Sequence, residues 1–423
     1  MTRSCSRNRV LMVAFHVPPF GSSSGVQRTL RFIQYLPQYG WDPVLLAPNP
    51  RVYRERSDDL LNQIPAATPV YRAFALDAAK HLAFRGRYLH WMCFPDRFAT
   101  WLAGAIPAGM MLIKRYRPAA IWTTYPVATA HVIGYALARL SGLPWVADFR
   151  DPMLYEAWPE EPFARRAAAW AERLTVCRCA RAVVVTESAL QLYRERYANL
   201  PSERFTMIAN GYDETAFEGI ASAGPSVNEP LLLLHAGLLE PVDRDPADLF
   251  EAIAALKRNR LISSDSLRVI LRASGFDDRY GAQINALQID DIVSLAPALP
   301  YKQALAEMAA ASGLILLQGP TCNRQIPAKL YEYMRAGPPI FAITDAAGDT
   351  FRLLQSMGVV DIAQFGSRES IATELARFVT AIPNGSAARV PLSTMHRYDR
   401  RTLTAELARV FDQCTSARNV PVQ

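Results

Sequence analysis

The sequence predicts an α/β protein that contains two doubly wound domains. Its 423 residues suffice for two domains of about 150 to 200 residues, each with its own core. Both halves repeat one pattern, in which an apolar run of strand length leads through a short loop into an amphipathic helix. Unbroken apolar runs are typical of parallel strands covered on both faces, and parallel strands require a helical crossover between them.

The first half opens with the run 9–15 (RVLMVAF), which we expect to be the first strand. A Pro-Pro and small-residue loop leads into a helix, and 41–47 (WDPVLLA) then forms the second strand. Gly21 and Gly25 flank three serines at the start of that helix. There the backbone can approach a ligand closely, and free N–H groups favour a phosphate or a sugar.

Polar side chains follow the later strands of the first half. His131, Asp148, Arg150 and Asp151 come just after apolar runs of strand length. In a doubly wound sheet such positions line the ligand crevice, where a histidine or a carboxylate can take a proton from a hydroxyl. The alternatives are that His131 is a structural residue at its helix start and that Arg150 pairs with one of the two aspartates.

The segment 80–117 combines bulky apolar residues with seven basic ones. It is either an interfacial surface that reaches a membrane or a set of helices with basic outer faces. A net charge of +7 and a pI near 9.1 would suit an anionic partner. We expect no nucleic-acid partner.

The six cysteines are scattered and lack the spacing of a zinc site or a disulfide scaffold, so a reducing cytosol is expected. The N-terminal apolar run is short for a signal peptide. The most apolar later segment, 98–113, contains Pro107 and falls short of the roughly 18 residues of a spanning helix. We therefore expect a cytoplasmic protein.

A polar stretch, 216–230, is expected to link the domains, and a second series of strands and helices begins with LLLLHAG. We assign 1–215 and 231–395 to the two domains and 396–423 to a final amphipathic helix that crosses back to the first. Arg244 lies in a loop before a helix, a position suited to a diphosphate. Its alternative is a salt bridge to a neighbouring aspartate.

The stretch 325–341 (QIPAKLYEYMRAGPPIF) is the most informative in the second half. Pro327 begins a helix, Gly337 ends it before two prolines, and a strand follows. Glu332 lies near the helix N-terminus, which attracts phosphates, and its carboxylate could accept hydrogen bonds from sugar hydroxyls. The stretch therefore suits a nucleotide, although an ordinary amphipathic helix with a solvated Glu332 is the alternative.

Taken together these motifs resemble the GT-B glycosyltransferases, and among them the retaining enzymes of family 4. The resemblance extends over nearly the whole chain. It rests on the opening strand, Pro-Pro and Gly-rich loop, on TTYPVATAHVIGYALARLSGLPWVADFRDPM, on ANGYD, on HAGLLEPVDRDP and on IPAKLYEYMRAGPPI. It implies two Rossmann-like domains that face a central cleft, with the acceptor bound by the first and a nucleotide sugar by the second.

The resemblance also implies roles for individual donor-side residues. Glu332 matches the second glutamate of the family's pattern and would contact the ribose, whereas the first glutamate is replaced by Arg324. Of the family's two diphosphate-binding cations, one place holds Leu238 and the other Arg244. Lys329 or Arg272 could substitute for the missing cation, and Gly21, Gly25 and Gly237 would complete the donor site.

On the acceptor side the resemblance places Gln27, Arg28, Asp148 and Arg150. Either His131 or Asp151 would be the base, and Arg244 would act catalytically on the leaving group. Asp243 and Asp245 flank Arg244 and are interpreted as loop carboxylates, so we expect no metal and no other cofactor.

The activity implied is transfer of a sugar, with retention, from a nucleotide diphosphate to a glycan or a polyprenyl-diphosphate-linked acceptor. Cell-surface polysaccharide synthesis is the expected context, at the inner face of an anionic membrane. Two alternatives remain: a non-hydrolysing nucleotide-sugar epimerase, and a catalytically silent GT-B partner subunit, which Arg324 and Leu238 would favour.

Overall fold

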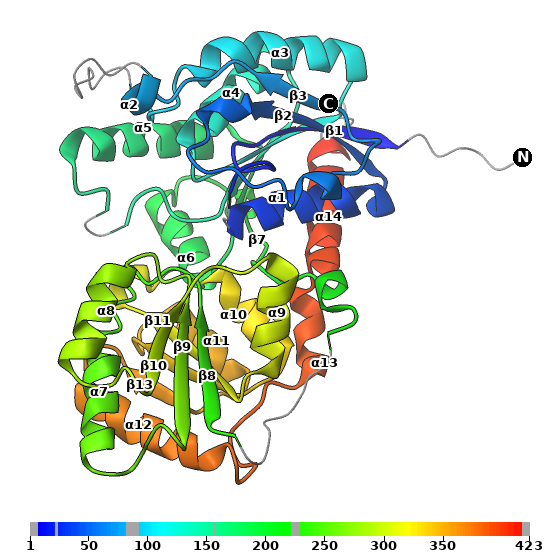
Figure 1. Cartoon of the computed structure of the whole chain (residues 1–423). Coiled ribbons are helices and arrows are strands. Elements are labelled where there is room, and N and C mark those ends of the chain that lie inside the picture. Colours follow the sequence, from blue (N-terminus) through cyan, green and yellow to red (C-terminus); the bar gives the residue numbers. More distant parts are fainter. Residues whose placement is uncertain (1–6, 22–23, 82–92, 156–157, 221–228, 417–423) are drawn as a thin grey trace, which may run out of the picture. The chain divides into compact units, whose positions relative to one another are not determined.

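The computed structural model describes residues 7–21, 24–81, 93–155, 158–220 and 229–416 (Figure 1). By their contacts the residues form two compact units. Unit 1 comprises Met1–Ala209 and Arg400–Gln423, and unit 2 comprises Asn210–Asp399. The chain therefore passes between the units at 209/210 and 399/400, compared with the expected boundaries near 215 and 396. Most of the expected linker, 221–228, lies outside the described residues.

Unit 1 contains a seven-stranded parallel sheet with the order β3-β2-β1-β4-β5-β6-β7. Its strands are β1 (Asn8–Val13), β2 (Trp41–Pro48), β3 (Val70–Ala73), β4 (Ala120–Thr124), β5 (Trp145–Phe149), β6 (Arg181–Val184) and β7 (Phe205–Met207). The apolar runs predicted the central strands. They did not predict β3, because this short edge strand is largely exposed and carries no apolar run.

Helices cover both faces of this sheet (Figure 1). They are α1 (Ser24–Tyr35), α2 (Ala78–His81), α3 (Trp101–Tyr116), α4 (Ala128–Ser141), α5 (Pro162–Arg178), α6 (Glu187–Arg196) and α14 (Arg400–Ser416). On one face α14 packs beside α1, and its Asp412 Oδ1 accepts a hydrogen bond of 3.0 Å from Trp41 Nε1. The predicted return of the final helix to the first domain is confirmed.

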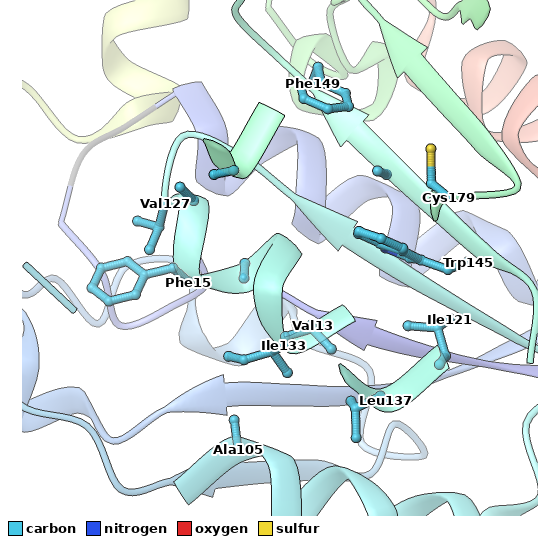
Figure 2. Close-up of a cluster of buried hydrophobic side chains, with 14 of the residues drawn as sticks. Val13, Phe15, Ala105, Ile121, Val127, Ile133, Leu137, Trp145, Phe149 and Cys179 are labelled. Carbon is cyan, nitrogen blue, oxygen red and sulfur yellow. The ribbon is translucent and has the colours of Figure 1, made fainter. Parts of the chain in front are cut away.

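The opposite face of the sheet packs against α3, α4 and α5, which lie side by side. Figure 2 shows part of this core, in which Val13, Ile121 and Trp145 of the sheet meet Ile133 and Leu137 of α4. These side chains are almost completely buried. Each contributes about 1.5–3 kcal/mol through removal of apolar surface from water.

Unit 2 contains a six-stranded parallel sheet with the order β10-β9-β8-β11-β12-β13. Its strands are β8 (Leu231–Ala236), β9 (Leu267–Arg272), β10 (Val293–Ala296), β11 (Gly313–Gln318), β12 (Ile340–Thr344) and β13 (Ile362–Gln364). The strand order reverses between β8 and β11. In open α/β sheets ligands bind outside the carboxyl ends of the strands at such a switch point.

Two helical layers cover this sheet as well. One consists of α7 (Ala247–Arg258), α8 (Asp277–Ala286) and α12 (Arg368–Ala381), and the other of α9 (Tyr301–Ala310), α10 (Ala328–Ala336), α11 (Asp349–Ser356) and α13 (Leu392–Met395). The prediction of two doubly wound domains is thus confirmed. No helix in the described ranges combines the length and apolar character that crossing a bilayer demands.

Candidate functional site

The candidate site of unit 2 lies at the carboxyl end of β8, where the strand order reverses. There Tyr333 Oη of α10 accepts a hydrogen bond of 2.7 Å from the backbone N–H of Ala236. This bond holds α10 beside the end of the strand. Gly237 follows with φ +108°, and a Cβ there would lie 3.0 Å from Lys329 Nζ. A glycine is therefore required at 237 both by its backbone conformation and by the lysine beside it.

His235 is fully buried and orients Lys329. Its Nδ1 lies 2.9 Å from the carbonyl oxygen of Ile315, and its Nε2 lies 3.1 Å from Lys329 Nζ. Burial and the charge of Lys329 hold the pKa of His235 well below its usual range, so the ring is neutral. Nε2 also lies 3.1 Å from the carbonyl oxygen of Gly237. The tautomer that carries its proton on Nδ1 donates to Ile315 and lets Nε2 accept from the Lys329 ammonium.

Lys329 and Arg244 form a pair of cations at this site. Burial, followed by the charge of Arg244, lowers the pKa of Lys329 to about 7, although the carboxylate of Glu332 acts in the opposite direction. Arg244 Nε is buried and has no hydrogen-bond partner among the described residues. Two cations that repel each other and retain an unused donor suit an anion with several acceptor oxygens.

Glu332 lies on α10 within reach of these cations. Tyr301 Oη, from the first turn of α9, donates a hydrogen bond of 2.7 Å to Glu332 Oε1. The carboxylate is thus held by the protein rather than fully solvated, and it stays partly accessible. The Glu332 carboxylate could therefore still accept a hydrogen bond from a ribose hydroxyl, as the sequence predicts.

Three other donor-side residues can now be placed. The Arg272 guanidinium forms two hydrogen bonds to the Glu307 carboxylate and a third, of 2.6 Å, to the carbonyl oxygen of Pro297. It is therefore engaged, and of the two possible substitutes Lys329 is the one beside Arg244. Leu238 exposes 42% of its side chain, and Arg324 lies in the turn before α10.

The two aspartates that flank Arg244 stabilise its loop. Asp245 Oδ1 accepts a hydrogen bond of 3.0 Å from the N–H of Ala247 at the start of α7, and Arg279 pairs with the other oxygen at 3.1 Å. The carbonyl oxygen of Asp243 accepts from the N–H of Gly319 at 2.6 Å. Across the described ranges, no three His, Cys, Asp or Glu residues are grouped closely enough to hold a metal ion.

In unit 1, Arg28 and Asp148 form a buried ion pair. Arg28 Nε and Nη2 donate to the two carboxylate oxygens at 3.0 and 2.8 Å. Its Nη1 and Nη2 also donate to the carbonyl oxygens of Ala209 and Ile208. These contacts connect α1, β5 and the end of the unit. Of the two aspartates expected as partners of Arg150, Asp148 is thus engaged by Arg28, because α1 places Arg28 against that carboxylate. The acceptor-side roles of Arg28 and Asp148 stay predictions.

Arg150 is buried against the start of α1. Its Nη1 lies 3.5 Å from Nδ1 of His16, which follows β1. Burial and then the charge of Arg150 lower the pKa of His16 to about 3, so this ring is neutral. The negative charges of Asp151 and Asp148 favour the charged form of Arg150, against the effect of its burial.

Gly25 provides the space that the Arg150 guanidinium occupies. A Cβ at position 25 would lie 2.1 Å from Arg150 Nη1. Gly21 has a comparable role, since its Cβ would lie 3.0 Å from the Cβ of Glu55 and its N–H donates to the Glu55 carbonyl oxygen. In the described structure both glycines make room for neighbouring protein atoms. Their expected role in donor binding stays a prediction.

Replacing Gly25 with alanine is therefore expected to destabilise unit 1 by about 1–3 kcal/mol, because an overpacked contact outweighs the gain in helix propensity. Unfolding can be followed by tryptophan fluorescence, since all seven tryptophans lie between Trp41 and Trp170 and thus report on unit 1. The control is Gly281→Ala in α8 of unit 2, where the new methyl meets only Leu295 at 3.8 Å. Because unit 2 contains no tryptophan, its unfolding is followed by far-UV circular dichroism. Equal, neutral effects of both changes would contradict the assignment.

His131 lies in the core of unit 1. Its ring has no exposed surface, Nδ1 lies 2.6 Å from Thr123 Oγ1, and Phe149 and Trp145 pack against it. Burial lowers its pKa to about 3. As described here the ring contacts no solvent, so it could serve as a base only after becoming exposed. The other candidate base, Asp151, is partly exposed in the loop after β5.

Sequence reasoning missed three residues that shape these sites: His16, His235 and Tyr301. Both histidines come directly at the end of an apolar strand, so the rule that points to strand ends could have identified them. Tyr301 carries no such signal, because its contact with Glu332 depends on how α9 packs beside α10. The last acceptor-side candidate, Gln27, is buried, and its Oε1 has no hydrogen-bond partner among the described residues.

Part of this chain matches a known protein family. Residues 24–211 match the family described as "Glycosyl transferase 4-like domain". Among curated protein sequences none matches the chain.

Solved structures share the fold at low sequence identity. The apo lipopolysaccharide outer core galactosyltransferase WaaB is 12% identical with a TM-score of 0.62, over 97% of this chain and 99% of that one. Sucrose-phosphate synthase from Thermosynechococcus elongatus is 13% identical with a TM-score of 0.68, over 97% and 100%. HepE from Anabaena, solved with UDP and glucose, is 14% identical with a TM-score of 0.64, over 96% and 99%.

An epimerase shares the architecture too. The UDP-GlcNAc 2-epimerase of Neisseria meningitidis, bound to UDP-GlcNAc, is 11% identical with a TM-score of 0.58, over 96% of this chain and 100% of that one. At such identities these likenesses concern the fold alone. The chain thus carries a glycosyl transferase 4-like domain over residues 24–211, within a fold of the GT-B glycosyltransferase type.

Proposed function

We propose that this protein is a glycosyltransferase that uses a nucleotide-diphosphate sugar as donor. The observation that carries the proposal is the convergence of Lys329 and Arg244 at the N-terminal half of α10, beside the end of β8. Fixed cations and helix N-terminal N–H groups stabilise the charge that develops on a departing diphosphate. The family match and the nucleotide named in the HepE complex support this choice of donor.

In the proposed reaction the bond between the anomeric carbon and the β-phosphate oxygen breaks, and its electron pair remains on that oxygen. Lys329 and Arg244 stabilise the resulting charge, so the departure requires no metal. Glu332 binds the ribose. The acceptor hydroxyl attacks from the same face, which retains the anomeric configuration, and its proton passes to Asp151 or to the departing phosphate.

The finer assignments extend this proposal to the acceptor. Unit 1 would bind a glycan or a polyprenyl-diphosphate-linked sugar, and the product would enter cell-surface polysaccharide. These assignments are supported by the glycosyl transferase 4-like domain in that unit and by the outer core galactosyltransferase among its structural neighbours.

A binding screen tests the donor assignment. The purified chain would be examined by thermal shift and calorimetry against UDP, GDP, ADP and their common sugars, together with Glu332→Ala and Arg244→Ala. We expect one nucleotide to bind, and loss of either side chain to weaken it by about tenfold or more, because each hydrogen bond to a charged group contributes about 1.5–3 kcal/mol. Arg258→Ala, an exposed change at the far end of α7, is the control.

The alternatives predict different outcomes from the same material. A silent partner subunit would bind the nucleotide without releasing sugar to any acceptor or to water. An epimerase would invert the sugar of the donor in the absence of an acceptor, which NMR detects directly. Failure of every nucleotide to bind at millimolar concentration would contradict the donor assignment itself.

A further inference from the structure

The outer surface of α3, α4 and α5, here called the α3–α4–α5 face, has an unusual charge composition. The three helices contain seven basic residues, all exposed: Lys114, Arg115, Arg139, Arg165, Arg166, Arg173 and Arg178. They contain one acidic residue, Glu172, which is buried and paired with Arg196 at 2.6 Å. The exposed surface of these helices therefore carries positive charge alone.

A comparable layer in unit 2 shows that this composition does not come from the fold. Helices α7, α8 and α12 contain five basic and six acidic residues, several of them in ion pairs such as Arg368–Asp248. A helical layer on such a sheet can thus be electrically mixed. The charge of the α3–α4–α5 face is a property of this particular surface.

Each helix of the face also exposes a large apolar side chain next to its basic residues. Met111 on α3, Leu140 on α4 and Trp170 on α5 are 42%, 61% and 43% exposed. Lys114 follows Met111 by one helical turn, and Arg166 and Arg173 lie one turn before and after Trp170. Apolar and cationic groups therefore alternate across three neighbouring helices.

The surface near the end of α3 is hollowed where these two kinds of side chain meet. A hollow of about 540 Å³ is lined by Pro107, Met110, Met111, Lys114 and Arg115. Its walls are apolar at the proline and methionines and cationic at the other two residues. Figure 1 shows α3, α4 and α5 together on one side of the unit 1 sheet.

We infer that the α3–α4–α5 face docks onto an anionic lipid bilayer. Charge complementarity selects phosphate headgroups, and the exposed Met, Leu and Trp side chains select a bilayer over a soluble polyanion, which offers them no apolar phase. The sequence offered such a surface as one of two interpretations of 80–117. The inference places it on three helices, of which only α3 lies in that segment, and 82–92 lies outside the described residues. The inference rests on the proposed function only in that the bilayer would carry the acceptor.

Vesicle co-sedimentation of the full chain tests this inference. We expect binding to phosphatidylcholine vesicles that contain phosphatidylglycerol, and little binding to phosphatidylcholine alone. Each Lys or Arg near an anionic surface adds about fivefold to the affinity, so the triple change Lys114→Gln, Arg166→Gln, Arg173→Gln should weaken binding roughly 100-fold.

The control triple change, Arg258→Gln, Arg268→Gln, Arg409→Gln, removes the same charge from exposed positions elsewhere and should alter binding less than about threefold. Heparin serves as a soluble polyanion without an apolar phase. The double change Leu140→Ser, Met111→Ser should therefore weaken vesicle binding but leave heparin binding unchanged. Equal losses in the two triple variants, or losses on heparin alone, would overturn the inference. Nucleotide affinity is measured on the same variants. Failure to bind vesicles with nucleotide binding intact would contradict the membrane inference alone, whereas failure to bind any nucleotide would contradict the proposed function.

Discussion

Replacing Lys329 with methionine should lower kcat for sugar transfer by about 100- to 1000-fold, the usual effect of removing one charged donor that stabilises a developing anion. Methionine fills a similar volume, and the partly buried ammonium lies beside a second cation, Arg244, so unit 2 should not lose stability. The control is Lys257→Met, which removes a lysine from a surface ion pair with Asp291. A loss of activity below about threefold would contradict the assigned role.

The pH dependence of donor affinity gives an independent readout of this lysine. The pKa of Lys329 is about 7, and the ammonium binds the diphosphate only when protonated. Affinity for a nucleotide sugar should therefore be highest below that pKa and fall about tenfold between about pH 7 and pH 8.5. An intact sugar nucleotide is the appropriate probe, because it lacks the terminal phosphate ionisation of a free nucleoside diphosphate.

Lys329→Arg keeps its charge over this range, so its affinity should be independent of pH, and Lys329→Met should bind weakly and equally independently of pH. If the arginine variant retains the falling profile, a group other than Lys329 titrates. A pH-independent arginine variant that still binds would show that Lys329 acts through its charge and not only by filling the site.

Replacing Arg28 with methionine should destabilise unit 1 by about 3–5 kcal/mol, because Asp148 would stay buried without its cation. The guanidinium also donates to the carbonyl oxygens of Ile208 and Ala209, so its loss removes this donor from both. Tryptophan fluorescence during urea unfolding measures the effect in the affected unit.

The double variant Arg28→Met, Asp148→Leu should recover part of this loss, since it removes the uncompensated charge. Arg7→Met breaks an exposed pair with Asp42 in the same unit and should change stability by less than about 1 kcal/mol. Additive losses in the double variant would show that the two residues contribute separately rather than as a buried pair.

Local pattern was sufficient to predict the course of the chain. Continuous apolar runs identified β1, β2, β8 and β11, and Gly337 marked the end of α10, where the structure has φ +98°. These signals are local, because a strand buried on both faces must be apolar throughout and a left-handed cap selects glycine. The motif in α10 likewise placed Glu332 and Lys329 on one short helix.

Partner choice among polar residues could not be predicted in the same way. Asp148 lies two positions from Arg150 in the sequence, yet it pairs with Arg28, 120 residues away, because α1 packs against the end of β5. His131 had the chemistry of a base, but the turn of α4 directs its ring into the core. The sequence could not distinguish Arg272 from Lys329 as the second cation. The structure does, because Arg272 pairs with Glu307.

The sequence by itself thus determined that the chain forms two parallel α/β domains, that α14 returns to the first, and that the loop after β8 and helix α10 carry candidate cations. Only the tertiary structure decided which cations are available to an anion and which are neutralised, and it alone assembled the α3–α4–α5 face from three separate helices. The physical reason is that hydrophobic periodicity depends only on residues close together in the sequence. Desolvation and charge pairing, in contrast, depend on groups that meet only after the strands and helices have packed.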